Sequence, residues 1–277
     1  MAWMCRRLRV SRSGYYAWRR RKPSARAQRD LYLTVRIRAL FEEFDATYGS
    51  PRIYDELVAE GEAVSRKRVI RIMQQEDLCA HVPKKFRRTT DSNHDRPVAE
   101  NTVNRDFNPA GPNQLWAADL SYIRTWQGWV YLAVVLDLYS RRVVGWATAE
   151  HMRTELPLTA LQMAIDHRRP LAGLVHHSDR GSQYASEAYQ DALADNHMLC
   201  SMSRKGNCWD NSVVESFFAT IKKDLIYRHT WPTTHSVVAA IERYMSFYNG
   251  RRRHSALGSR CPVEYEAIML GRFAEAA

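Results

Sequence analysis

Hydrophobic and polar residues alternate along the middle of the chain. In LWAADLSYIRT (115–125) the bulky apolar side chains share one face and Asp119 lies on the other, a two-residue period that predicts a strand. The next run, 129–140, is almost continuously apolar, which is typical of a strand covered on both faces. A third strand is predicted at 141–149, so three strands follow one another with short turns between them.

The hydrophobic period lengthens after this third strand. Helices are predicted at 155–167 and 186–196, short strands at 171–179 and 197–203, and a further helix around Glu215. The order is three strands followed by alternating helices and strands. It predicts an α/β fold in which a mixed five-stranded sheet carries helices on its faces.

The first 80 residues contain two patterns typical of helix–turn–helix structure. Ser11 is placed to cap a short helix, and further along Gly61 ends one helix while Ser65 caps the next. The apolar residues assigned to the interior of the second pair are Ile53, Leu57, Val58, Val69, Ile70 and Met73. The second helix of this pair begins with basic residues, and a basic first turn is what a recognition helix presents to the major groove of DNA. The residues predicted to contact DNA there are Arg66, Lys67, Arg68 and Arg71. The alternative is a helical hairpin that packs on another surface.

Residues 81–113 are polar and proline-containing, and they predict a linker with a basic patch that includes Lys84 and Lys85. Such a patch suits either a DNA backbone contact or a solvated tether. The predicted organisation is a helix–turn–helix DNA-binding region at 1–80, this basic linker at 81–113, an α/β core at 114–229 and a helical extension at 230–277.

The net charge of +11 is concentrated at the start of the chain, because residues 1–96 hold 22 Lys and Arg against 12 Asp and Glu. This imbalance favours a polyanionic partner, although a well-solvated basic surface gives the same count. No apolar run reaches the roughly 18–20 residues that span a bilayer. The five cysteines are scattered and include no CxxC pair, which argues against a disulfide framework.

Three acidic residues are the candidates for chemistry: Asp119 in mid-strand, Asp179 at a strand end, and Glu215 beside the apolar stripe of its helix. Each has a structural alternative. Ser212 and Glu215 fit a capping box, Asp179 suits an Asx turn, and Asp119 has the option of an arginine partner. Aspartate is, however, depleted in strands. Converging carboxylates repel one another unless a cation neutralises them, and an all-oxygen set suits Mg²⁺ or Mn²⁺ in phosphodiester chemistry.

At these residues the chain resembles the DDE transposase/integrase core, and most closely the second open reading frame product of IS3-family bacterial insertion sequences. The resemblance is carried by WAADLSYI, HHSDRGSQY and SRKGNCWDNSVVESFFATIKKDL, and 35 residues separate Asp179 from Glu215. The segments YGSPRI, VSRKRVIRIM and YNGRRRHSALGSRCPVEY extend it over essentially the whole chain.

The resemblance implies an RNase H-like integrase catalytic core preceded by a helix–turn–helix domain. It further implies that Asp119, Asp179 and Glu215 hold two Mg²⁺ ions, with Mn²⁺ as a substitute, while water and then a DNA 3′-OH attack phosphodiesters without a covalent protein–DNA intermediate. The expected partners are the terminal inverted repeats of the insertion sequence and target DNA, on which the protein forms a multimer in the bacterial cytoplasm, at the nucleoid. A protein from the upstream reading frame, or a fusion with it, is a further expected partner.

Other basic residues are secondary candidates for DNA contact. Lys222 lies on the Glu215 side of its helix and suits the phosphates of the transposon end, or is a surface lysine. Arg204 and Lys205 open a loop that precedes this helix. A basic run near the end of the chain suits a DNA backbone contact, although a surface charge run is the ordinary explanation. Its members are Arg251, Arg252 and Arg253.

Two alternatives to a transposase remain at this point. A nuclease of the RNase H type would use the same carboxylates to cut without joining. A non-catalytic DNA-binding regulator would use them only for structure.

Overall fold

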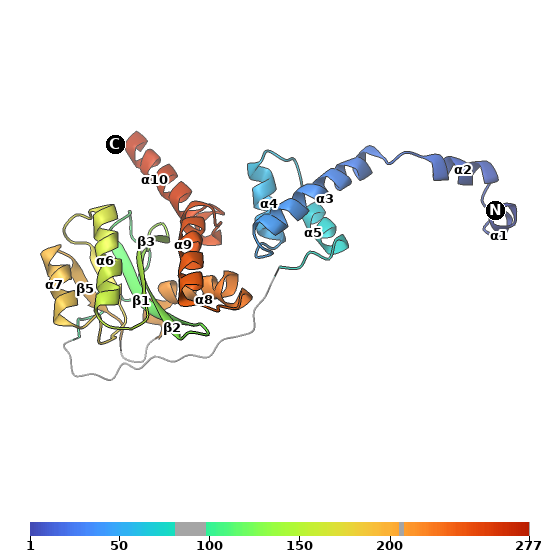
Figure 1. Ribbon diagram of the computed structural model, residues 1–277. Coiled ribbons are helices and arrows are strands. Elements are labelled where there is room, and N and C mark those ends of the chain that lie inside the picture. The colour runs from blue at the N-terminus through green and yellow to red at the C-terminus, as the bar shows by residue number, and fades with distance from the viewer. Residues whose placement is uncertain (81–97, 205–207, 277) are drawn as a thin grey trace. The chain divides into compact units, whose positions relative to one another are not determined.

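The computed structural model describes residues 1–80, 98–204 and 208–276 (Figure 1). The chain divides into two compact units, Met1–His81 and Val82–Ala277. Most of the predicted linker, including Lys84 and Lys85, lies outside the described residues. The boundaries predicted at residues 80, 113 and 229 therefore stay predictions.

The first unit is helical. Helices α3 (Ala25–Glu43), α4 (Ser50–Ala59) and α5 (Arg66–Gln75) enclose a small apolar core. Its fully or almost fully buried members include Leu33, Ile37, Leu40, Ile53, Leu57, Val69, Ile72 and Met73. Helix α3 was not among the sequence predictions.

The predicted turn between α4 and α5 is confirmed in its two punctuating residues. Gly61 has φ +84°, a left-handed conformation that favours glycine, and the hydroxyl of Ser65 accepts a hydrogen bond from the N–H of Arg68. Two core assignments were wrong, because Val58 and Ile70 are exposed whereas Ile72 is buried. The buried face of α5 is the stripe Val69, Ile72 and Met73, which follows the i, i+3, i+4 spacing of one helix face and leaves Ile70 outside it.

Two short helices precede this bundle, α1 (Ala2–Arg7) and α2 (Arg12–Arg20). The predicted cap of α2 is confirmed, because Ser11 Oγ accepts a hydrogen bond from the N–H of Gly14 at 2.9 Å. No residue of α2 is buried.

The second unit is built on a mixed sheet. Within the described residues it has five strands: β1 (Leu115–Arg124), β2 (Trp129–Asp137), β3 (Arg142–Ala149), β4 (Val175–Ser178) and β5 (Leu199–Met202). Their order across the sheet is β3-β2-β1-β4-β5. The first three strands are antiparallel neighbours, and β4 and β5 join them in parallel. The predicted order of strands and helices along the chain and the predicted mixed sheet are confirmed, whereas the order of the strands across the sheet was not predicted.

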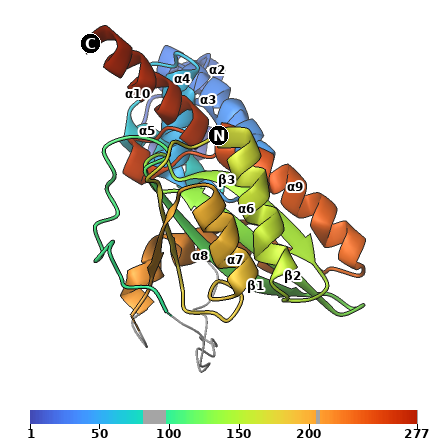
Figure 2. The same ribbon diagram turned by 90° about the vertical axis from the view of Figure 1, so that its left-hand side faces the viewer.

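Helices cover both faces of this sheet (Figures 1 and 2). On one face, α6 (Glu155–Arg168) and α7 (Glu187–Asp195) pack against the β-strand residues that include Trp116 and Ala118. Helix α6 approaches β3 closely at Gly145, where an added Cβ would lie 2.1 Å from the carbonyl oxygen of Ala160. Only a residue without a side chain permits this contact.

The opposite face carries α8 (Ser212–Asp224) and α9 (Thr234–Gly250), which cover Ala117 and Ile123 of β1. Successive side chains of β1 thus point to opposite faces of the sheet, as the alternation in its sequence predicts. Asp119 belongs by this alternation to the face of α8, the side opposite Trp116.

The last helix, α10 (Pro262–Ala276), is tied to the sheet through a buried carboxylate. Glu266 accepts from Arg142 at 3.0 Å and from Arg168, at the start of β3 and the end of α6. Arg168 also lies 3.5 Å from Asp137 at the end of β2. None of the described helices is both long enough and apolar enough to cross a membrane.

Candidate active site

Strand register brings Asp119 and Asp179 together. In the parallel β1–β4 ladder, Ala118 is the partner of Ser178. The next residue of each strand is an aspartate, and neighbouring strands lie about 4.8 Å apart. The two aspartates therefore lie side by side, Asp119 within β1 and Asp179 directly after the end of β4. Both are half-buried.

Glu215 reaches the same region from α8. The helix packs against β1, and Asn211, the residue before it, donates a hydrogen bond from Nδ2 to the carbonyl oxygen of Ala118 at 3.4 Å. Val214, Phe217 and Phe218 are buried under the helix, and half-buried Glu215 lies on the flank of this stripe, as the helical period predicts. The cap of α8 is Asn211, and Ser212 is the first helical residue rather than the cap that a capping box requires.

The electrostatics of Asp119 show that the three carboxylates share one region. Burial raises the pKa of Asp119 well above its ordinary value, and repulsion from Asp179 and, to a smaller extent, Glu215 raises it further. A hydrogen bond from the N–H of Leu120, at 2.8 Å, and the nearby Lys222 ammonium act in the opposite direction. The site therefore holds more negative charge than its own cations balance.

Lys222 faces this surplus. Its ammonium lies 5.8 Å from the centre of the Tyr122 ring, which is a cation–π distance, and its charge acts on Asp119. Burial lowers the pKa of Lys222 below its ordinary value. Tyr122 in turn packs edge-on against Trp129 at 5.2 Å. Lys222 is therefore beside the acidic residues rather than on a distant surface.

The carboxylates surround one region without forming a closed ligand set. Among the described residues, no group of three His, Cys, Asp or Glu side chains is close enough to hold a metal ion in the present conformation. One oxygen of Asp179 accepts a hydrogen bond from the N–H of Gly181 at 2.8 Å.

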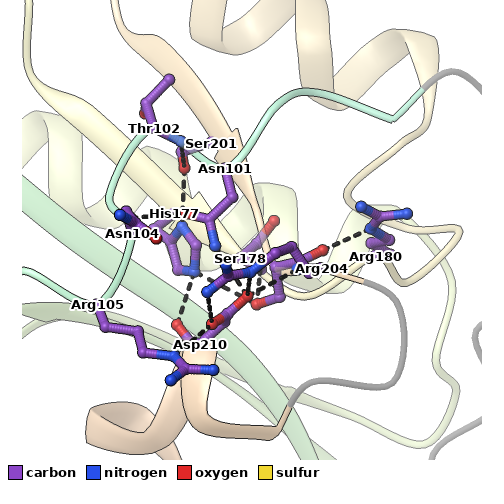
Figure 3. A network of polar contacts seen from close by, with 11 residues as sticks. Asn101, Thr102, Asn104, Arg105, His177, Ser178, Arg180, Ser201, Arg204 and Asp210 are labelled. Atoms are coloured by element: carbon purple, nitrogen blue, oxygen red, sulfur yellow. Dashed lines mark hydrogen bonds and ion pairs between the residues drawn. The ribbon is translucent and has the colours of Figure 1, made fainter.

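A fourth carboxylate, Asp210, is the centre of a network of polar contacts (Figure 3). It lies in the short turn Cys208–Asn211 before α8, and its side chain is completely buried. Its oxygens accept hydrogen bonds from Asn101 Nδ2 at 2.8 Å, from Arg105 Nε at 3.1 Å, and from the N–H, Nε and Nη2 of Arg204 at 2.9 Å each. Above all the Arg204 contacts hold the pKa of Asp210 well below its usual range. The carboxylate therefore stays ionised.

His177 connects Asp210 to the strand that carries Asp179. Its Nε2 lies 2.8 Å from the carbonyl oxygen of Asp210, and its Nδ1 lies 2.9 Å from Ser201 Oγ (Figure 3). A carbonyl oxygen only accepts, so Nε2 carries the proton and Nδ1 accepts from the serine hydroxyl. Burial lowers the pKa of His177, which keeps the ring neutral at pH 7. Strand β4, strand β5 and the start of α8 are thereby joined beside Asp179.

The residues predicted to contact DNA in α5 have partners within their own unit. Arg68 Nε and Arg71 Nη2 donate to Asp30 of α3 at 2.7 and 2.8 Å, and the Arg66 guanidinium lies 5.1 Å from the centre of the Tyr54 ring. Lys67 is exposed. Arg68 and Arg71 hold α5 on α3, and any DNA contact must use the part of each side chain that remains exposed.

The basic run after α9 divides into different roles. Arg252 is only 6% exposed and donates from Nε to the buried Asp224 at 2.7 Å. This side chain joins α8 to the end of α9 inside the unit, and the DNA contact of Arg252 stays a prediction. Arg253 donates to the carbonyl oxygen of Ser259 at 2.8 Å, and Arg251 is exposed.

In the loop before α8, the predicted Lys205 lies outside the described residues, and Arg204 is present as a partner of Asp210. Sequence reasoning missed the network of Asn101, Arg105, His177 and Asp210. The available signal was Asp210 itself, an acidic residue directly before the helix of Glu215.

Comparisons with known proteins agree with this architecture. The family described as "Integrase core domain" matches residues 109–208, a second family of the same description matches residues 196–262, and the "HTH-like domain" family matches residues 27–86. The chain is 43% identical to an "Insertion element IS600 uncharacterized 31 kDa protein" of Shigella sonnei, over 95% of this chain and 97% of that protein.

It is also 41% identical to "Transposase InsF for insertion sequence IS3A" of Escherichia coli (strain K12), over 95% of this chain and 92% of that protein. Among solved structures, the HTLV-2 integrase catalytic core domain in complex with magnesium aligns at 19% identity, over 57% of this chain and 98% of that one, with a TM-score of 0.45.

Proposed function

Because the chain belongs to the IS3 family of insertion-sequence transposases, we propose that Asp119, Asp179 and Glu215 are the catalytic carboxylates with which it cuts and joins DNA. Membership of the family makes the protein a transposase and places it among the polynucleotidyl transferases. The proposal concerns which residues perform the transfer and how.

The observation that carries the proposal is the meeting of the three acids. The register Ala118–Ser178 predicts that Asp119 and Asp179 are neighbours, and the pKa of Asp119 responds to both Asp179 and Glu215. A protein gains no stability from carboxylates that repel one another. Their convergence is therefore better explained by chemistry than by folding.

The donor set fits a divalent cation. It consists of carboxylate oxygens, the ligands that Mg²⁺ prefers, and its surplus negative charge is what a bound cation would neutralise. Asp119, Asp179 and Glu215 would hold the metal, for which we propose two Mg²⁺ ions with Mn²⁺ as a substitute. When bound, such ions supply charge stabilisation at the attacking and leaving oxygens of a phosphodiester.

The remaining residues position DNA and these carboxylates. Lys222, between Tyr122 and Asp119, is proposed to hold a phosphate next to the reacting one. The side chain of Asn211 holds the start of α8 on the backbone of Ala118, next to Asp119. Water first attacks the phosphodiester at the end of the insertion sequence, and the freed 3′-OH then attacks a second phosphodiester in line.

The proposed partners follow from this reaction. Two insertion-sequence ends must be brought together with a target, so we propose a multimer on DNA, with the terminal inverted repeats recognised in part by the first unit. A protein from the upstream reading frame, or a fusion with it, is proposed to complete this complex. The proposed location is the bacterial cytoplasm, where the chromosome lies.

The test is a strand-transfer assay with labelled transposon ends and Mg²⁺. We expect Asp119→Asn, Asp179→Asn and Glu215→Gln each to lower strand transfer by about 10³-fold or more, because each removes several kcal/mol of stabilisation at the reacting phosphate. Asp191→Asn, at an exposed position of α7, is the matched control and should retain full activity. DNA affinity should change little in all four variants.

Strand transfer that persists in Asp179→Asn would refute the assignment. Products limited to nicks in the wild-type protein would favour the nuclease without joining activity.

A further inference from the structure

Asp210 has more positive partners than it needs. Its single negative charge is balanced by one guanidinium, yet both Arg105 and Arg204 donate to it (Figure 3). The cluster therefore keeps a surplus of one positive charge. A completely buried carboxylate with one arginine already satisfies the usual requirement that buried charges are paired, so the second arginine calls for another explanation.

Both arginines also keep donors that point away from the carboxylate. Their side chains are 47% and 46% exposed, whereas that of Asp210 is 0% exposed. Within the described residues, the terminal nitrogens of Arg105 and the Nη1 of Arg204 donate to no protein acceptor. The Asp210 contacts hold the inner edge of each guanidinium, and its outer edge remains available to a ligand.

The backbone at Arg105 is adapted to this position. Asn104 and Arg105 have φ of 44° and 67°, the left-handed region that is strained for a residue with a side chain. A hydrogen bond from the N–H of Asn104 to Asn101 Oδ1, at 2.8 Å, holds this turn. The segment thus accepts a strained conformation that places Arg105 on Asp210, more than 100 residues away along the chain.

The cluster lies next to the proposed catalytic acids. The carbonyl oxygen of Asp210 accepts from His177, which is two residues before Asp179, and Asp210 itself is five residues before Glu215. A nucleic-acid strand that brings a phosphodiester to Asp179 and Glu215 carries further phosphates at intervals of one nucleotide. A neighbouring phosphate of this kind is the ligand that we expect the two guanidiniums to bind.

We propose that Arg105 and Arg204, held on the buried carboxylate of Asp210, form a binding site for a backbone phosphate of the DNA strand beside the one that reacts. Arginine suits this role because its planar fork donates two hydrogen bonds to a phosphate. Asp210 fixes both forks before DNA arrives, so little side-chain freedom is lost on binding. The proposal rests on the proposed function only in taking DNA as the substrate.

The ordinary alternative is that the cluster is a structural bracket around the loop before α8. A bracket predicts that loss of one arginine affects folding alone. A phosphate site predicts an additional change in the salt dependence of DNA binding, because each phosphate contact releases about 0.9 counterion from duplex DNA.

The experiment measures DNA affinity of the full chain by fluorescence anisotropy, with a labelled duplex, EDTA and a series of KCl concentrations. We expect Arg105→Gln to weaken binding by about tenfold at roughly 0.1 M salt and to reduce the slope of log K against log salt by about 1. Arg204→Gln should behave alike. Arg142→Gln is the matched control, since Arg142 also pairs with a buried carboxylate, Glu266, and should leave the slope unchanged.

An unchanged slope in Arg105→Gln would overturn the proposal. Since EDTA removes divalent ions, the result is independent of whether Asp119, Asp179 and Glu215 catalyse the reaction.

A second measurement is unaffected by any loss of stability. Ethylation of individual phosphates should block wild-type binding at a position near the cleaved bond, and Arg105→Gln should remove the block at that position alone. An identical interference pattern in the two proteins would also refute the phosphate site.

Discussion

The two units of the chain use charge in different ways. In the helical unit, ion pairs such as Arg36–Glu60 and Asp30–Arg71 lie at the surface, between helices whose apolar core is already complete without them. In the sheet unit, several carboxylate side chains are buried in the interior. Four are buried with arginine partners, namely Asp137, Asp210, Asp224 and Glu266.

This contrast isolates Asp119. Unlike the four buried carboxylates, Asp119 lies near two other carboxylates. The Lys222 ammonium is the cation that lowers its pKa. In the sheet unit, buried acids that serve the fold are paired with arginine, and the acid left facing other acids is the one expected to serve catalysis. The surface pairs of the helical unit carry no such information, because solvent screens them.

The largest difference between buried and surface pairs is expected for the buried pair of Asp224 and Arg252. Arg252→Ala leaves a buried carboxylate without its cation, so we expect the free energy of unfolding to fall by about 3–5 kcal/mol. Chemical denaturation monitors this loss. Asp224→Asn combined with Arg252→Met should recover much of it, since the double variant buries no charge. A loss below about 1 kcal/mol in Arg252→Ala would place this pair with the surface pairs.

The pH dependence of stability should be steep because of a buried histidine. Burial lowers the pKa of His176 to about 3, whereas an unfolded chain has the ordinary value of 6.5. As the pH falls below 6.5, His176 is protonated in the unfolded state but stays neutral in the folded state. The contribution of this histidine to stability is therefore fully present above pH 6.5 and is lost progressively toward pH 3. The loss approaches about 1.4 kcal/mol per pH unit, or roughly 2 kcal/mol by pH 5.

Denaturation of the wild type and His176→Asn between pH 7 and 5 measures this slope. In the variant the slope should lack the contribution of the one proton that His176 takes up on unfolding. Asp210 does not interfere, because its pKa lies below its usual range and it stays ionised throughout this interval. Equal slopes in wild type and His176→Asn would contradict the prediction.

Asp119→Asn should separate activity from stability. The pKa of Asp119 is raised in the folded protein, so its ionised form at neutral pH opposes folding. We therefore expect the variant, inactive in strand transfer, to be more stable than the wild type at pH 7 in EDTA. The difference should shrink below pH 4, where the wild-type carboxyl is protonated in both states. A less stable variant at pH 7 would mean that this carboxylate supports the fold.

The smallest effect is expected in the helical unit. Arg36→Ala removes a partly exposed pair with Glu60, and the free energy of unfolding should change by less than about 1 kcal/mol. High salt should abolish even this difference. A loss as large as that of Arg252→Ala would show that the surface pairs stabilise the unit after all.

Much of the fold was accessible from the sequence because it is encoded locally. The two-residue period of 115–125 fixed β1 and the face of Asp119, and the apolar stripe of α8 put Glu215 on its flank. Ser11 and Ser65 predicted where two helices start, because the side chain of a capping residue hydrogen-bonds only to the first turn of its own helix. The three candidate acids were found in the same way, from their places within these elements.

Tertiary structure decided which charges meet. Arg252 and Arg251 are adjacent in an unbroken basic run, yet one is buried on Asp224 and the other is exposed. Arg105 and Asp210, more than 100 residues apart, share hydrogen bonds that no periodicity encodes. Helical and strand periods specify which face of an element is apolar, whereas the partner of a charged side chain depends on how distant elements pack. For this reason the sequence alone determined the helices, the strands and the candidate acids. Only the tertiary structure decided which arginine pairs with which carboxylate.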